Sequence, residues 1–73
     1  MVTVKKTMWS IDRMQMSQTL LSGIQEAWEM AERYFNVVTD AYCITQTEFG
    51  NGSFIIRVMN KEKILYKIES VHE

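Results

Sequence analysis

The residue types that most often carry catalysis are scarce in this chain of 73 residues. Its one histidine, His72, is the second-to-last residue of the sequence, where chains are usually frayed. A serine or cysteine nucleophile needs a histidine that is held rigidly beside it. We therefore expect that the protein is not an enzyme.

Three carboxylates, Glu26, Glu29 and Glu32, recur every three residues. Paired carboxylates can act as general acid and base. This spacing, however, is also typical of the solvated face of an amphipathic helix. We interpret these glutamates as surface charges.

Metal and cofactor sites also lack their usual residues. Zinc needs three or four Cys, His or carboxylate ligands, and Cys43 with His72 cannot supply a closed site. The segment Gly50-Asn51-Gly52 is too short for a phosphate-binding loop and is typical of a turn. We expect no metal, no cofactor and no small-molecule substrate.

The net charge of −1 argues against strong non-specific attraction to nucleic acid. The charges are nevertheless segregated, because residues 17–40 are mostly acidic and residues 53–68 mostly basic. A nucleic-acid-associated protein therefore stays open as the alternative function, since a basic sheet face can bind phosphates. Its candidate residues are Arg57, Lys61, Lys63 and Lys67.

The elements that would position these residues are readable from periodicity. A helix over about 23–38 is predicted by apolar residues at spacings of three and four, with Ser22 and Gln25 as a capping box. The stripe that should face the core comprises Leu21, Ile24, Trp28, Ala31, Phe35 and Val38.

After residue 40 the apolar period changes to two. It predicts a three-stranded antiparallel meander over 41–49, 53–59 and 63–69, packed on the helix as an α+β fold. A two-residue turn at Asn51-Gly52 would pair Phe49 with Phe54, and a three-residue turn at 60–62 would pair Val58 with Ile64. Both turns put Phe54, Ile56 and Val58 on the helix side.

The N-terminal third is open to two interpretations. Residues 2–6 alternate and could add an edge strand, and residues 10–21 fit a shorter helix that Ser10 would cap. Residues 1–73 should form a single domain. With one cysteine and no apolar run of membrane-spanning length, we expect a cytoplasmic protein that is not membrane-bound.

Apolar residues exceed what one helix and three strands can bury. Outside the predicted core lie Trp9, Met14, Met16, Leu20, Ile55, Met59 and Leu65. Either the N-terminal segment covers the open sheet face, or another chain does. We favour a partner protein or a homodimer, and thus a small interaction protein that regulates or inhibits a macromolecule by occluding it. The size and composition are those of many phage or mobile-element proteins.

Overall fold

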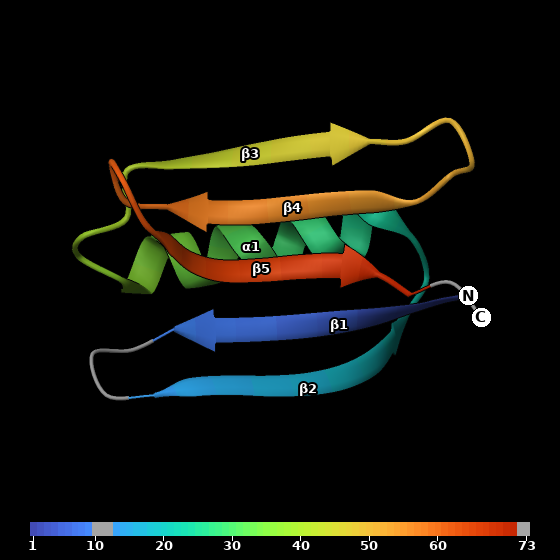
Figure 1. Cartoon of the computed structure of the whole chain (residues 1–73), viewed down its shortest axis with the longest axis horizontal. Helices are drawn as coiled ribbons and strands as arrows, with labels where there is room; N and C mark the ends of the chain where they lie inside the picture. The colour runs from blue at the N-terminus through green and yellow to red at the C-terminus, as the bar shows by residue number, and fades with distance from the viewer. Residues whose placement is uncertain (10–12, 72–73) are drawn as a thin grey trace.

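The computed structural model describes residues 1–9 and 13–71 of the chain. They form one helix and a five-stranded antiparallel sheet, which confirms the predicted α+β class (Figure 1). In chain order the elements are β1 (Val2–Trp9), β2 (Met14–Leu21), α1 (Ile24–Val37), β3 (Cys43–Glu48), β4 (Phe54–Met59) and β5 (Ile64–Ser70).

The strands lie in the spatial order β2-β1-β5-β4-β3. The last strand, β5, therefore lies in the middle of the sheet and joins the hairpin β1–β2 to the hairpin β3–β4 (Figure 1). Its pairing with β1 aligns Val4 with Ser70, and the Val71 N–H donates to the Thr3 carbonyl at 2.9 Å. The predicted meander is confirmed as the β3–β5 half of this sheet.

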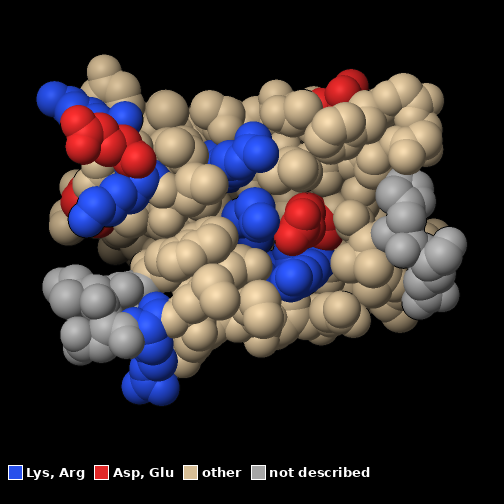
Figure 2. Space-filling model, in the orientation of Figure 1, with Lys and Arg blue, Asp and Glu red and all other residues tan. Residues whose placement is uncertain are grey.

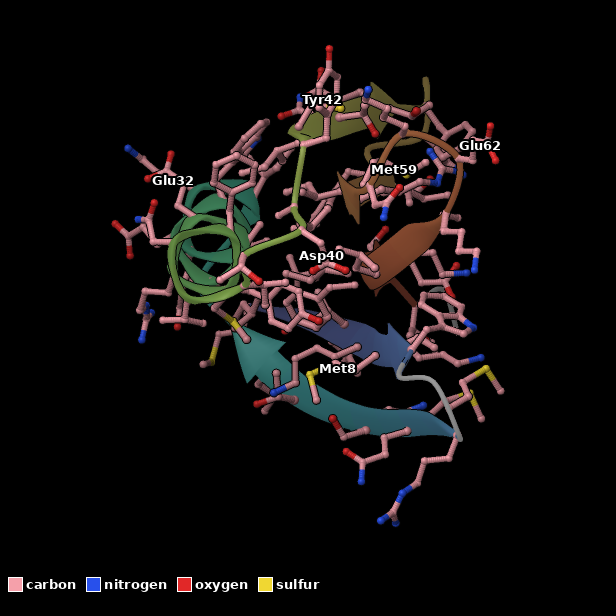
Figure 3. All side chains as sticks on the ribbon, turned by 90° about the vertical axis from the view of Figure 1, so that its left-hand side faces the viewer. Met8, Glu32, Asp40, Tyr42, Met59 and Glu62 are labelled. Atoms are coloured by element: carbon pink, nitrogen blue, oxygen red, sulfur yellow. The ribbon has the colours of Figure 1, made fainter. Side chains whose placement is uncertain are left out.

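Helix α1 packs on one side of the sheet only, as the end-on view in Figure 3 shows. Alternation along β4 sends Phe54, Ile56 and Val58 to this side, where all three are buried as predicted. The helix contributes Ala27 and Ala31, whose small side chains let it approach the sheet closely. The bulkier Ile24, Trp28, Met30, Tyr34 and Phe35 pack around this core.

The helix begins with a capping contact that differs from the predicted one. The Glu26 carboxylate, not Gln25, accepts hydrogen bonds from the Ser22 N–H and hydroxyl, each at 2.8 Å. These bonds, the one from the backbone first, lower the pKa of Glu26 below its ordinary value. Gly23 is the N-cap residue and offers no side chain for this purpose.

The predicted short helix over 10–21 is wrong. Residues 14–21 form strand β2, paired with β1 over eight consecutive residues from Trp9↔Met14 to Val2↔Leu21. Met, Gln and Leu are good helix formers, but helix propensity is a small effect and pairing with a neighbouring strand outweighs it. Ser10, the predicted cap, lies outside the described residues.

Strand β1 replaces the predicted edge strand over 2–6 and is longer. It is not an edge, because it pairs with β2 on one side and β5 on the other. The N-terminal segment thus widens the sheet by two strands instead of covering its open side.

The predicted β3–β4 register is wrong by one residue, because Glu48, not Phe49, pairs with Phe54. A two-residue turn of the predicted kind requires positive φ at Asn51. Among the described residues only Gly52 has a φ in the left-handed region, at 87°. The connection is a three-residue loop closed by bonds from the Phe49 N–H to the Ser53 carbonyl (2.9 Å) and from the Gly52 N–H to the Phe49 carbonyl (3.1 Å).

The β4–β5 register also differs, because Val58 pairs with Tyr66 and not with Ile64. A bulge lies between Val58 and Met59, and the slip of two residues preserves which side each residue faces. In the described ranges, no helix has the length and hydropathy of a membrane span.

Candidate interaction surface

The side of the sheet opposite α1 is called the open face here. Residues that pair directly in antiparallel strands share a face, so the registers assign most of its members. Leu65, beside the β4–β5 bulge, is assigned by its alternation with the buried Tyr66. They are Cys43, Thr45 and Thr47 of β3, Ile55, Arg57 and Met59 of β4, Leu65, Lys67 and Glu69 of β5, Thr3, Lys5, Thr7 and Trp9 of β1, and Met14, Met16, Gln18 and Leu20 of β2. Figure 2 views the molecule from this face.

Every apolar residue that the sequence suggested for partner binding lies on the open face. Those from β1 and β2 are Trp9, Met14, Met16 and Leu20, and those from β4 and β5 are Ile55, Met59 and Leu65. None of them belongs to the buried core. The structure therefore joins two groups that are about 35 residues or more apart in the sequence into one surface.

The three β2 residues are the most exposed of this set. Met14 is 52% exposed, and Met16 and Leu20 are each 57% exposed. The others are half-buried, because neighbours on the same face cover part of each side chain. Among these strands, β2 therefore exposes the most apolar surface on the open face.

Basic side chains occupy the middle of the same face, with one acidic group among them (Figure 2). The registers identify the basic residues as Lys5, Arg57 and Lys67 and the acidic one as Glu69. Arg57 pairs directly with Lys67, so two like charges face each other across β4 and β5. Such a pair is unfavourable in an isolated sheet and favours an anionic group between them.

Lys67 is the centre of this cluster. Its Nζ lies 3.4 Å from Glu69 Oε1 and 5.8 Å from the centre of the Trp9 ring. Within the described part of the chain, Glu69 is the acidic partner of Lys67, and Arg57 has no ion pair. The neighbouring Thr7 is only 2% exposed, although it lies on the open face, so the long side chains beside it close over it.

The other two basic candidates lie elsewhere. Lys61 and Lys63 are exposed in the turn between β4 and β5, at one end of the sheet. Lys61 Nζ lies 5.8 Å from the ring centre of Tyr42, which precedes β3. The four basic residues suggested by the sequence therefore form two groups, and Lys5, which the sequence reasoning missed, joins the central one. Val2 and Val4 are spaced as residues that face the core. This spacing already indicated that Lys5, one residue further along the strand, faces the other side.

On the helix side, a hollow of about 400 Å³ lies between the second half of α1 and the end of β1. Met8, at its rim, points to this side in Figure 3. The hollow is lined by Met8, Met30, Arg33, Tyr34, Val37 and Tyr66. It offers apolar surface and one guanidinium.

The residues considered for chemistry are dispersed. Glu32 points away from the sheet on α1 (Figure 3), and Cys43 is half-buried at the start of β3. Across residues 1–9 and 13–71, no three His, Cys, Asp or Glu side chains are placed to hold a metal ion together. His72 lies outside the described residues.

Comparison with protein-family models, with curated proteins and with solved structures gave no match.

Proposed function

We propose that this chain is a non-catalytic interaction protein that covers a surface of a macromolecular partner with its open face and thereby regulates or inhibits it. The observation that carries the proposal is a set of apolar residues on one sheet face that none of the described elements covers. They are Trp9, Met14, Met16, Leu20, Ile55, Met59 and Leu65. Contiguous apolar surface of this kind is typical of protein-binding sites. We also propose a cytoplasmic location, because a chain with one cysteine has no internal disulfide of the kind that small secreted domains usually need.

The charges on this face suggest the chemistry of the partner. Arg57 and Lys67 face each other, and Lys5 pairs directly with Glu69 beside them. An acidic side chain of a partner protein, placed between Arg57 and Lys67, would relieve their repulsion. We expect a partner surface with a carboxylate surrounded by apolar residues.

A capture experiment tests this function. The immobilised chain should retain a specific protein from a lysate of its source organism at both 0.1 and 0.5 M salt. Leu65→Lys should abolish capture, because it places a charge within the apolar surface. Gln25→Lys is the matched control, since it adds the same charge on the exposed surface of α1 and should leave capture unchanged. Equal capture by both variants contradicts the proposal.

A nucleic-acid-associated function remains the second candidate, favoured by the facing pair of Arg57 and Lys67. The Lys67 ammonium already lies over Trp9, the aromatic residue that could stack with a base on this face. Binding of mixed-sequence DNA or RNA oligonucleotides that weakens steeply with salt, and is lost in Arg57→Gln, would favour this alternative. Binding of neither kind of oligonucleotide supports the protein-binding function.

A further inference from the structure

Strand β2 forms one edge of the sheet and lacks the features that usually protect such an edge. It runs over eight residues, Met14–Leu21, without a charged residue or a proline. Its register with β1 is unbroken over all eight pairs, so no bulge turns it away. Natural sheets block exposed edges with charges, prolines or bulges, because the free N–H and C=O groups otherwise pair with another strand.

The opposite edge is better protected. Strand β3 has six residues and ends with the charged Glu48. The Gln46 side chain accepts a hydrogen bond from the indole N–H of Trp28, which links this edge to α1. Strand β2 is therefore the edge that pairs more easily with a further strand.

We propose that β2 pairs antiparallel with β2 of a second copy of this chain, so that the two sheets become continuous. This inference concerns the strand edge and stands apart from the function proposed for the open face. A twofold axis perpendicular to the sheet relates the copies, and the arrangement is closed because each copy uses the same edge. Pairing of β2 with β3 of another copy would instead leave free edges and propagate into a filament.

The side chains of β2 suit this pairing. Because directly paired residues share a face, one residue must face its own copy, and the axis passes between the two copies of Ser17 or of Gln18. Centred on Ser17, Met14 of each copy faces Leu20 of the other, whereas centring on Gln18 makes Met16 face Leu20. Either register covers apolar side chains that are more than half exposed in the single chain. Because β2 has no charged residue, no like charges face each other across the pairing.

Charges just beyond β2 are complementary in this arrangement. Arg13 precedes the strand, and its partner position in the other copy is Leu21 or Gly23, next to the corner where Ser22 holds the Glu26 carboxylate. The proposed axis therefore brings Arg13 of each copy to the end of the sheet where α1 of the other copy begins, with Glu26 in its first turn.

The solution mass tests the proposal directly. Light scattering coupled to size exclusion should give twice 8.6 kDa as the concentration rises toward 200 µM. Gln18→Lys should raise the dimer dissociation constant at least about tenfold, since it brings two ammonium groups together near the axis. Thr47→Lys is the matched control, because Thr47 is exposed on the open face of the other edge strand, and it should leave the mass unchanged.

Disulfide trapping provides a second measurement that does not depend on weakening the dimer. In a Cys43→Ser background, Ser17→Cys or Gln18→Cys should form an intermolecular disulfide under mild oxidation, because Cα atoms paired directly across an axis lie about 4.5–5.5 Å apart. The wild-type chain, with Cys43 on β3, should not be trapped.

The proposal is overturned by any of four results. These are a mass of 8.6 kDa at every concentration, assemblies that grow beyond two copies, equal effects of the two lysine variants, and trapping of Cys43 in place of residues 17 and 18. A dimer that Gln18→Lys dissociates and that one of the two β2 cysteines traps supports it.

Discussion

The rings of Tyr34 on α1 and Tyr66 on β5 pack against each other, with centroids 4.7 Å apart and planes inclined by 38°. This contact joins the helix to the central strand of the sheet. Burial raises the pKa of the Tyr66 hydroxyl, and Tyr34 adds to this effect. Burial, followed by the charge of Asp40, also raises the pKa of Tyr34.

The tyrosine pair predicts a loss of stability in alkaline solution. Above about pH 10 the unfolded chain releases tyrosine protons that the folded protein retains, so the free energy of unfolding falls as the pH rises through the folded-state pKa values. Urea denaturation at pH 8, 9, 10 and 11 measures the slope. Tyr66→Phe should reduce the slope and Tyr34→Phe/Tyr66→Phe should reduce it further, and an unchanged slope in both variants would contradict the assignment.

Gly52 predicts an asymmetry between the two glycines of the β3–β4 loop. Gly52→Ala should lower the free energy of unfolding by about 1 kcal/mol, because alanine at a φ of 87° is strained. Gly50→Ala meets no atom within 4 Å and no positive φ, so it should leave stability unchanged or raise it by up to about 1 kcal/mol. Thermal denaturation of both variants distinguishes them, and equal effects would be inconsistent with the turn described.

The complete burial of Ile56 predicts that removing a single methylene from its side chain destabilises the fold. The residue is 1% exposed between the sheet and α1, and Ile56→Val should cost about 1 kcal/mol of unfolding free energy through the methylene removed and the space left. Val37, which is 77% exposed at the end of the helix, provides the control, since Val37→Ala should change stability by less than about 0.5 kcal/mol. Similar losses at both positions would place Ile56 outside the core.

The Ser22–Glu26 contact predicts a measurable titration. Because its pKa is lowered, Glu26 stabilises the fold above its ordinary pKa of 4.5, and this contribution disappears as the pH falls through the folded-state value. Ser22→Ala removes the hydroxyl bond but keeps the backbone bond, so the pKa of Glu26 should move part of the way back. NMR titration of the Glu26 carboxyl carbon measures it, and a pKa that does not move would argue against the hydroxyl bond in solution.

Exposed apolar residues of β2 should be unimportant for folding. Met14→Ser and Leu20→Ser should each change the free energy of unfolding of the dilute chain by less than about 0.5 kcal/mol, because both side chains are more than half exposed. Denaturation at low micromolar concentration checks this. Losses above about 1.5 kcal/mol would mean that these side chains support the fold and not a surface.

The sequence predicts α1 and β3–β5 well because their local preferences agree with the final packing. Isoleucine, valine and phenylalanine alternate along β4, and Trp28 and Ala31 recur at helical spacing. The register of β3 was not predictable in the same way. Asn-Gly most often makes a two-residue turn, but here Gly52 alone adopts positive φ, and this shifts every β3 residue to the other face.

Strand β2 was mistaken because its residues suit two structures. Met14 and Leu21 are seven residues apart, as on one face of a helix, whereas Met14, Met16 and Leu20 alternate with Gln15, Ser17 and Thr19 as in a strand. Pairing with β1 decides between them, and no local preference contains that information. The apolar residues predicted to lie outside the core are on the open face in spite of this error. For β4 and β5 the prediction depended only on the alternation of faces along each strand. The β2 residues were included because the predicted core had no room for them.

The central place of β5 has a consequence for how the protein is made. Val4 gains its second neighbour only when Ser70 is available, so until β5 joins the sheet the chain consists of two separate hairpins and a helix. Contacts between such distant segments form slowly, and until then the nascent chain offers β1 and β4 as additional unpaired edges. Early termination before Ile64 would leave two half-sheets with nothing to join them.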